Sequence, residues 1–309
     1  MRKLVLLIFV LFSSLCLAET YEMVIPKKPG GVADPVGREI SKYLHDKFGD
    51  TFVVTNKPGG NGKIAYDYLS QKPKDSKTML LLDTPFLYSK VLIKDPGFDY
   101  SSLDLVVPIV RLPMTLSVNK NIGVNTIDDL IKLAKTRPLN CGATTTATEF
   151  VGRFLMYHWK LDNVNVIRFG NAGDMLPQLI NGNLDCSVDG ITSQIELHKA
   201  NQLKIILIAG KHKNKSVPDV TVLNDIIPNT TFYVWYGIAF NKDSSFKGKN
   251  EIKTALKNLQ KDPEFIAWTE LQNLEISPLE NDPQAWLNKE YDRLEKIRHD
   301  IHMEKTNGN

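Results

Sequence analysis

The chain has 309 residues, 42% of them hydrophobic, and a formal net charge of +3. This length corresponds to about two globular domains. Removing the basic residues Arg2 and Lys3 of the leader described next leaves a charge of +1. A chain so close to neutral has no basic footprint for nucleic acid, and the short basic run 211–215 is interpreted as a solvated loop.

The first eighteen residues have the pattern of a secretory signal. A basic start is followed by an apolar run, 4–12, that is too short to span a bilayer, and then by small residues. We expect cleavage after Ala18 and a mature protein in the periplasm. The alternative is a lipoprotein modified at Cys16, but Leu15 is bulky for the position before a lipidated cysteine.

Strand-like and helix-like segments alternate after the leader, which predicts an α/β fold with mostly parallel sheets. The predicted strands, in chain order, are 21–25, 51–55, 78–82, 105–110, 115–118, 139–141, 164–168, 184–188, 203–209 and 231–240. The helical patterns with the clearest signals are 35–48, 126–135, 146–160, 264–272 and a long segment that begins at Pro283.

No glycine- or proline-rich linker divides the chain, so we expect two lobes joined by crossing strands rather than by a tether. The predicted crossings are 107–118 and 232–240. The expected organisation is a signal peptide at 1–18, a first lobe formed by 19–117 together with 238–309, and a second lobe at 118–237. Ligands of open α/β sheets bind beyond the carboxyl ends of the strands, which places the site in the cleft between the lobes.

The first glycine turn lies between a strand and a helix, at Gly30-Gly31-Val32-Ala33. Unpaired N–H groups and the positive end of a helix dipole at such a turn favour an anion. The alternative is that the glycines only permit positive φ in a tight turn. We assign Asp34 to capping the helix.

The second glycine turn, Gly60-Asn61-Gly62-Lys63-Ile64-Ala65, matches the dinucleotide fingerprint G-x-G-x-x-G/A. A secreted chain does not meet nicotinamide cofactors, and the match follows the second strand rather than the first. A phosphate loop of the Walker type fails because Gly62-Lys63 is followed by isoleucine instead of Ser or Thr. We therefore expect no cofactor.

Polar residues also end the later strands. Thr146 and Glu149 form the pattern of a capping box, which leaves Thr144 and Thr145 with free hydroxyl and N–H groups at the start of the third helix. Asp189 ends a neighbouring strand. Arg168 has the geometry to clamp a carboxylate through two parallel hydrogen bonds, or it is a solvated strand end.

In the first lobe Thr84 follows Asp83, and its hydroxyl either reaches the cleft or belongs to the turn before Pro85. Catalytic and metal-binding patterns are absent from the sequence. The six histidines are scattered, His299 and His302 are interpreted as a surface pair, and there is no Gly-x-Ser-x-Gly motif.

Read in order, these motifs resemble the solute-binding proteins of tripartite tricarboxylate transporters, the Bug family, over essentially the whole mature chain. The matching segments are Ile25-Pro26 through Gly30-Gly31 to Asp34, Asn56 to Gly62, Leu139-Asn140 with the threonine run, Leu179 through Gly182 to Asp185, Val217 to Thr221, and Trp235 to Gly237. The family has an aromatic residue where this chain has Lys27, a proline at Lys28, and Thr or Ser at Ala33.

The resemblance implies a two-lobed type II periplasmic-binding fold that closes on an organic carboxylate and delivers it, as a monomer, to the membrane subunits of the transporter. Two lysines at the mouth favour a di- or tricarboxylate. The alternative is a periplasmic carboxylate sensor or enzyme on the same scaffold. The expected ligand-binding residues are Lys27, Gly30, Gly31, Val32, Ala33, Thr84, Thr144, Thr145, Arg168 and Asp189, with no catalytic residue and no metal ligand.

The two cysteines of the mature chain, Cys141 and Cys186, are expected to lie side by side. Each stands three positions before a predicted cleft residue, on strands that should be adjacent and parallel, so both side chains lie at one level of the sheet. A disulfide and a pair of buried thiols are both compatible with this placement, because a bridge between directly paired strands strains disulfide geometry.

Overall fold

The computed structural model describes residues 18–307. Its strands are β1 (Thr20–Ile25), β2 (Thr51–Asn56), β3 (Thr78–Asp83), β4 (Leu103–Asn119), β5 (Leu139–Ala143), β6 (Val164–Arg168), β7 (Cys186–Gly190), β8 (Leu203–Ile208), β9 (Thr221–Val222), β10 (Tyr233–Asn241) and β11 (Glu275–Ile276). Its α-helices are α1 (Ala33–Phe48), α2 (Lys63–Ser70), α3 (Thr84–Leu92), α4 (Ile127–Ala134), α5 (Thr146–His158), α6 (Ala172–Ile180), α7 (Ile191–Lys199), α8 (Leu223–Ile226), α9 (Lys249–Leu259), α10 (Pro263–Leu271) and α11 (Pro283–Asp300).

The first lobe is built on the strand order β2-β1-β3-β10-β4. β1 pairs in parallel with β2 and with β3, whereas β10 runs antiparallel to β3 and β4. The parallel strands carry helices α1, α2 and α3 after them, as right-handed crossovers require. Their carboxyl ends therefore share one edge of the sheet.

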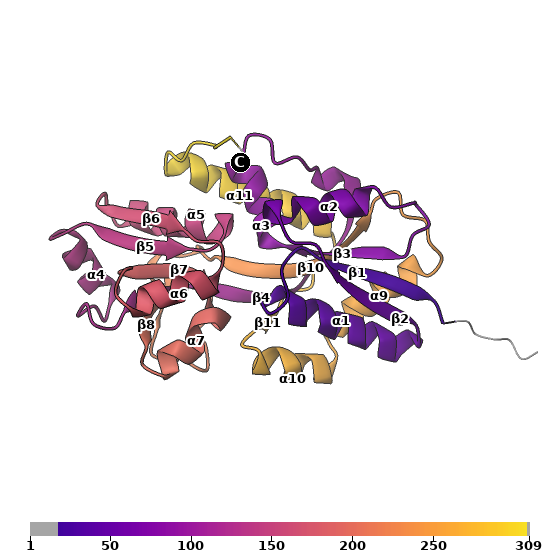
Figure 1. Cartoon of the computed structure of the whole chain (residues 1–309), viewed down its shortest axis with the longest axis horizontal. Helices are drawn as coiled ribbons and strands as arrows, with labels where there is room; N and C mark the ends of the chain where they lie inside the picture. Colours follow the sequence, from indigo (N-terminus) through magenta and orange to yellow (C-terminus); the bar gives the residue numbers. More distant parts are fainter. Residues whose placement is uncertain (1–17, 308–309) are drawn as a thin grey trace, which may run out of the picture.

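The second lobe continues from the same β4 in the order β4-β7-β5-β6, with β8 on β4 and β9 on β8. β5 is parallel to β6 and β7, and β4 is antiparallel to β7 and β8. Figure 1 shows the two groups of strands at opposite ends of the molecule, with β4 and β10 running between them. The fold is the expected two-lobed α/β architecture with crossing strands.

β4 is one continuous strand of 17 residues, although the sequence predicts two separate runs there. The predicted strands 105–110 and 115–118 leave out residues 111–114, although the predicted crossing 107–118 spans them. The continuous strand contains Pro108 and Pro113, which lack the N–H group that a sheet requires. The strand tolerates both. The carbonyl of Pro108 accepts a hydrogen bond from the Gln260 side chain at 3.0 Å, and the pairing with β10 shifts between Tyr236 and Ile238.

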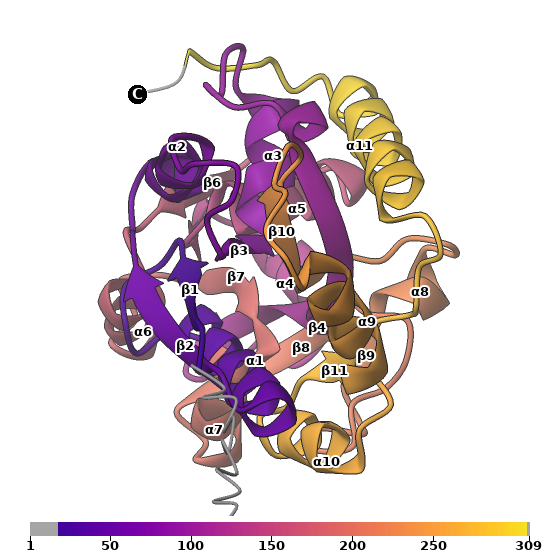
Figure 2. The same cartoon turned by 90° about the vertical axis from the view of Figure 1, so that its right-hand side faces the viewer.

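Apolar side chains form two continuous layers that run through both lobes. One contains the buried faces of α3 and α5, and helix α11 packs on it through Leu287 and Leu294. The other contains the inner faces of α1, α7 and α9. Figure 2 shows α11 lying along the outside of β4. In the layer that contains α3 and α5, Tyr88 of α3 contacts Phe150 of α5 with ring centroids 5.3 Å apart, so the two lobes are in contact there.

The adjacency of the two cysteines is confirmed. Cys141 and Cys186 are direct register partners on the parallel strands β5 and β7, both fully buried, and their Cα atoms lie 4.4 Å apart. Of the two states that the sequence leaves open, the structure has the disulfide.

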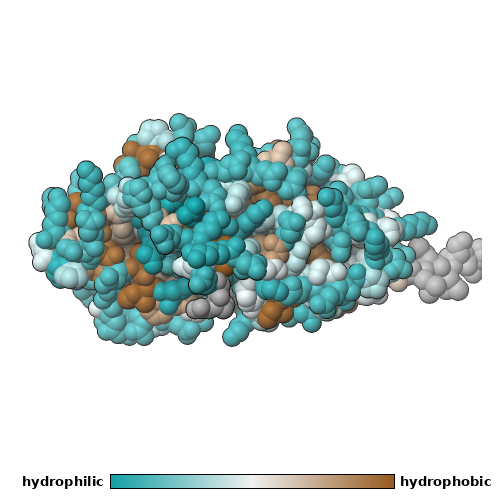
Figure 3. Space-filling view, turned by 90° about the horizontal axis from the view of Figure 1, so that it is seen from above, coloured by the Kyte–Doolittle hydropathy of each residue, from teal (hydrophilic) through white to brown (hydrophobic). Residues whose placement is uncertain are grey.

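The predicted signal peptide lies outside the described residues, apart from Ala18. Among residues 18–307 no helix is both long and apolar enough to cross a membrane. Figure 3 shows a face that is mostly hydrophilic, with scattered hydrophobic patches, some of them at the end formed by the second lobe.

Candidate functional site

A side-chain hydrogen bond links the end of β6 to the turn that follows β2, the two outermost strands of the eight-strand path. Arg168, the last residue of β6, donates a hydrogen bond from Nη2 to Oδ1 of Asn61 at 3.0 Å, and Asn61 lies in the glycine turn after β2. This side-chain contact links the two ends of the strand order without strand pairing, and β1, β3, β7 and β5 lie between β2 and β6 in that order. We call the region at the carboxyl ends of these strands the interlobe site and the Asn61–Arg168 contact the clasp.

Arg168 therefore lies at the solvent-exposed border of the interlobe site. Its side chain is exposed, and besides Asn61 it contacts Glu149, with Nη1 3.8 Å from the carboxylate. The long-range partner could not be inferred from the sequence, because Asn61 and Arg168 belong to different lobes.

The first glycine turn leads directly into α1. Gly30 has φ of +89°, in the region that favours glycine, whereas Gly31 does not have positive φ. A Cβ added at either position would meet nothing within 4 Å. Both glycines are exposed, so the fold leaves open space next to this turn.

The start of α1 corrects the assignment of Asp34 as its cap. The helix begins at Ala33, and Val32 in the capping position makes no side-chain cap hydrogen bond. Asp34 lies inside the first turn, where its carboxylate accepts hydrogen bonds from Arg38 at 2.9 Å and from the Asn56 amide at 2.9 Å. The hydrogen bond from Arg38 lowers the pKa of Asp34. The N-terminus of α1 thus remains without a side-chain cap.

The amide of Asn56 fixes the first turn to the second strand. Besides Asp34, it donates to the backbone carbonyl of Lys27 at 3.0 Å. One side chain at the end of β2 therefore holds both the beginning and the end of the turn that contains Gly30 and Gly31. This gives the turn a defined shape although Gly30 and Gly31 are exposed and have no side chains.

The second glycine turn has a structural explanation. Gly62 has φ of +102°, and a Cβ there would clash with the Phe86 ring, so packing of α3 against this turn requires glycine. Lys63, the next residue, pairs with Asp67 on its own helix at 2.5 Å. The fingerprint-like spacing thus arises from close packing between two helices of the first lobe.

Lys27 makes an ion pair with Asp83, the last residue of β3. The distance from Nζ to Oδ2 is 3.1 Å, with the Lys27 side chain 31% exposed and the Asp83 side chain 1% exposed. Burial raises the pKa of Asp83, against the opposing effect of Lys27. The other carboxylate oxygen, Oδ1, is buried and has no hydrogen-bond partner among the described residues. Sequence reasoning did not place Asp83 in the site.

Thr84 is fully buried and is occupied by a backbone contact. Its hydroxyl accepts from the Trp235 N–H at 2.6 Å, which ties the start of α3 to β10. The sequence allowed either a cleft residue or a turn residue here. In this structure the hydroxyl stabilises the crossing strand.

The polar groups of the turn between β5 and α5 form hydrogen bonds with one another, whereas the sequence predicts that they are free. The N–H groups of Thr144 and Thr145 both donate to the hydroxyl of Thr148, at 3.0 and 2.9 Å. The hydroxyl of Thr145 accepts from the Thr148 N–H at 3.2 Å and caps the helix. The expectation that the donors of Thr144 and Thr145 are free is therefore wrong, and so is the capping box of Thr146 with Glu149.

The sequence predicts free hydroxyl groups on Thr144 and Thr145, but among the described residues the unpartnered hydroxyl of this turn belongs to Thr146. Thr146 is 3% exposed at the first position of α5, and its hydroxyl has no hydrogen-bond partner among the described residues. A run of threonines gives several equivalent capping patterns, so the sequence offered no signal for which hydroxyl is left over. Thr146 is a candidate contact that sequence reasoning missed.

Asp189 closes the second-lobe side of the site. Its Oδ1 accepts from the Thr144 hydroxyl at 3.1 Å and from the Gly190 N–H at 2.8 Å. Burial raises the pKa of Asp189. Both Asp83 and Asp189 also act on Tyr236 of β10: burial raises the pKa of this phenol, and the two negative charges add to the effect. The two carboxyl groups thus approach one crossing strand from opposite lobes.

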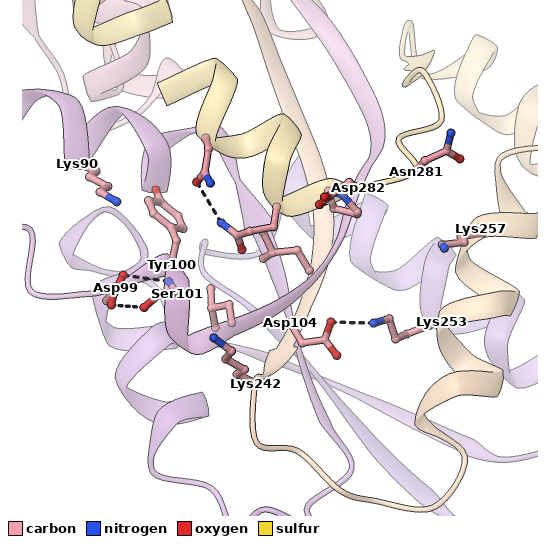
Figure 4. A pocket seen from close by; sticks show the side chains of 15 residues that line it. Lys90, Asp99, Tyr100, Ser101, Asp104, Lys242, Lys253, Lys257, Asn281 and Asp282 are labelled. Carbon is pink, nitrogen blue, oxygen red and sulfur yellow. Dashed lines mark hydrogen bonds and ion pairs between the residues drawn. The ribbon is translucent and has the colours of Figure 1, made fainter. Parts of the chain in front are cut away.

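A cavity of about 560 Å³ lies away from this site, where α9 and the start of α11 pass over β4. Figure 4 shows Lys242, Lys253 and Lys257 around it, with Lys253 paired to Asp104. Within residues 18–307 there is no group of three or more His, Cys, Asp or Glu side chains placed to hold a metal ion.

Comparison with protein families gives a match over residues 36–303 to the family described as "Tripartite tricarboxylate transporter family receptor". Among similar curated proteins, Protein BugT of Bordetella pertussis is 23% identical over 242 residues, which is 74% of each chain. A second protein of the same species, described as a UPF0065 protein, is 21% identical over 318 residues and covers 98% of both chains.

Solved structures with the same fold include Rpa4515 of R. palustris with adipate, with a TM-score of 0.84 and 19% identity, covering 94% of this chain and 100% of that one. The periplasmic binding protein BugD follows with a TM-score of 0.81 and 20% identity, over 93% and 99% of the two chains. MatC of Rhodopseudomonas palustris, with bound malate, has a TM-score of 0.76 and 18% identity, over 90% and 98%.

Proposed function

The chain belongs to the tripartite tricarboxylate transporter receptor family, a family of periplasmic solute-binding proteins, and from this premise we propose that it captures an organic carboxylate in the interlobe site. The preferred class is a dicarboxylate or tricarboxylate. The complex then delivers its ligand unchanged to the membrane subunits of a tripartite transporter. The protein acts as a monomer in the periplasm after cleavage behind Ala18.

One observation carries the proposal: the N-terminus of α1 has no side-chain cap and directly follows the exposed Gly30 and Gly31. Both lie at the carboxyl-terminal edge of the first-lobe sheet, as does the turn that contributes Asn61 to the clasp. Neither a positive φ nor a close neighbour explains the glycine at position 31. N–H groups at a helix N-terminus bind anions, and a carboxylate fits the open space above this turn. Gly30, Gly31, Val32 and Ala33 are thus the first-lobe contacts of the proposal.

The second lobe contributes from the other side. Thr146 has a buried hydroxyl without a partner among the described residues at the start of α5. Asp189, at the end of β7, accepts a hydrogen bond from Thr144. We include Thr144, Thr145 and Arg168 as positions that shape this side, and Lys27 and Thr84 on the first-lobe side. A ligand held by both lobes stabilises the closed form, because it makes contacts that the open form lacks.

Two carboxylates found in structures of the same fold, adipate and malate, are the natural first probes. In titration calorimetry with the mature protein, we expect saturable binding of at least one organic carboxylate and its recovery unchanged. Gly31→Pro removes one amide donor, and a charged hydrogen bond contributes about 1.5–3 kcal/mol, so affinity should fall about tenfold to a hundredfold. Conversion of the bound carboxylate to a product would instead support the enzyme alternative.

The control is Gly123→Ala, which lies outside the site at a turn with φ of +74° and has open space around it. It should lower the free energy of unfolding by about 1–3 kcal/mol, as Gly30→Ala does, without changing ligand affinity. Absence of binding by the wild-type protein across mono-, di- and tricarboxylates contradicts the proposal.

A further inference from the structure

We propose that Asp83 is a specificity-determining residue that limits the negative charge of the ligand by compensating Lys27. The inference rests on the proposed function and narrows its substrate class to dicarboxylates over tricarboxylates. Asp83 acts through Lys27 and need not touch the ligand.

The starting point is the geometry of the pair. The Asp83 carboxylate lies at the end of β3 with 1% of its side chain exposed, and the Lys27 ammonium reaches down to it from the first glycine turn at 3.1 Å. An ammonium group has three donors, and the Lys27 side chain keeps about a third of its surface exposed. It can therefore hold Asp83 and still donate to a ligand above the turn.

The positive charge of Lys27, however, is already paired with the carboxylate of Asp83. A carboxylate that approaches Lys27 also approaches Asp83, because the two side chains are in direct contact. On the other lobe the guanidinium of Arg168 lies 3.8 Å from the carboxylate of Glu149 and donates to Asn61. Lys28, the other lysine of the turn, is exposed to solvent, where its field is screened.

Each additional negative charge on the ligand therefore meets a region in which the positive charges of Lys27 and Arg168 are already paired. A first carboxylate is held by the backbone N–H groups of the turn, whose contribution does not depend on Lys27. A dicarboxylate is tolerated because the Lys27 ammonium still has free donors. A third carboxylate has no unpaired buried cation to meet among the site residues that the structure describes, so it lowers affinity.

Asp83→Asn is the direct test, because it keeps the shape of the side chain and removes its charge. The probes are malate and adipate, both dianions at neutral pH, and citrate, a trianion. In calorimetry we expect the wild-type protein to prefer a dianion, and Asp83→Asn to shift the citrate-to-dianion affinity ratio at least about tenfold toward citrate. The shift should shrink as salt concentration rises.

The double variant Lys27→Gln with Asp83→Asn removes both charges and should return the ratio to the wild-type value. Asp83→Ser serves as a second neutral variant if Asp83→Asn does not fold. The matched control is Asp243→Asn, which breaks an exposed ion pair with Lys74 beyond the far end of β10 and should leave the ratio unchanged.

The outcomes separate the two proposals. A wild-type protein that binds neither the dianions nor citrate overturns the proposed function and this inference with it. A wild-type protein that binds a dianion, together with an unchanged ratio in both neutral Asp83 variants, overturns the inference alone. A preference of the wild type for citrate also contradicts it.

Discussion

The two edges that form the interlobe site present their polar groups in different ways. On the first lobe the turn before α1 is made of exposed glycines, its helix has no side-chain cap, and its shape comes from the distant Asn56 amide. On the second lobe the turn before α5 is made of threonines that satisfy one another, with Thr145 and Thr148 forming a reciprocal cap.

The difference determines which backbone N–H groups are free to donate a hydrogen bond to a ligand. A backbone N–H group at an uncapped helix start is available to an anion, whereas an N–H group already bonded to a hydroxyl is not. We therefore propose that the first lobe binds the ligand through its backbone N–H groups. The proposed contacts of the second lobe are one hydroxyl and one carboxylate, because its other polar groups already hold the shape of the turn. The disulfide between β5 and β7 adds to the rigidity of this second edge.

The disulfide gives the largest expected effect. Replacing Cys141 and Cys186 together by Ala should lower the free energy of unfolding by about 4 kcal/mol, because the bridge closes a loop with a sequence separation of 45 in the unfolded chain. Urea unfolding of the oxidised wild type and the double variant measures this difference. Added reductant should destabilise only the wild type. Equal midpoints for both proteins would show that the second edge gains no rigidity from the bridge.

The first glycine turn can be tested with a matched pair. Gly30→Ala places a side chain at φ of +89° and should distort the turn at a cost of about 1–3 kcal/mol, with a loss of ligand affinity of about tenfold or more. Gly31→Ala adds the same methyl group without positive φ or a close neighbour. It should bind more tightly than Gly30→Ala in calorimetry with the best carboxylate. The reverse order would contradict the view that turn geometry governs binding.

The threonine turn predicts opposite results for two neighbouring residues. Thr145→Ala removes a cap and should lower stability by about 1 kcal/mol. Thr146→Val replaces a buried hydroxyl that has no partner among the described residues, so stability should stay the same or increase while ligand affinity falls. Thermal unfolding with and without a carboxylate separates the two effects. If Thr146→Val binds as well as the wild type, its hydroxyl is not a ligand contact.

The clasp should give the smallest effect, because Arg168 is exposed. A double-mutant cycle with Asn61→Ala and Arg168→Ala should yield a coupling energy of about 0.5–1 kcal/mol for the hydrogen bond that joins the lobes. Ligand dissociation followed by stopped flow should be faster in each single variant. A coupling energy of zero would mean that the two edges meet without holding one another.

The sequence predicts the fold well because the fold depends on patterns that repeat. Alternating strands and helices, the two crossing segments and the adjacency of Cys141 and Cys186 all follow from periodicity and spacing, and the structure confirms them. The predicted strands 105–110 and 115–118 leave a gap within β4, although the predicted crossing 107–118 spans it. Pro108 lies opposite the register shift in β10, and its carbonyl accepts a hydrogen bond from the distant Gln260.

The site was predicted less completely, for a physical reason. Its turns could be located from glycine and threonine runs, but the partner of each polar group depends on contacts between distant segments. Lys27 meets Asp83, and Arg168 meets Asn61, only after the lobes are assembled. Four threonines within five residues also offer several ways to cap one helix, and local sequence does not distinguish among them.

The position of β10 has a consequence for how the chain acquires its structure. β10 fills the gap between β3 and β4, yet it is synthesised after the whole second lobe. Until it arrives, both neighbours have an unpaired edge, and such edges are prone to pair with other chains. The first lobe therefore cannot complete its sheet as the chain emerges, and folding depends on contacts between residues far apart in sequence, which slows it. A truncated chain that ends before Tyr233 should accordingly aggregate rather than form a folded first lobe.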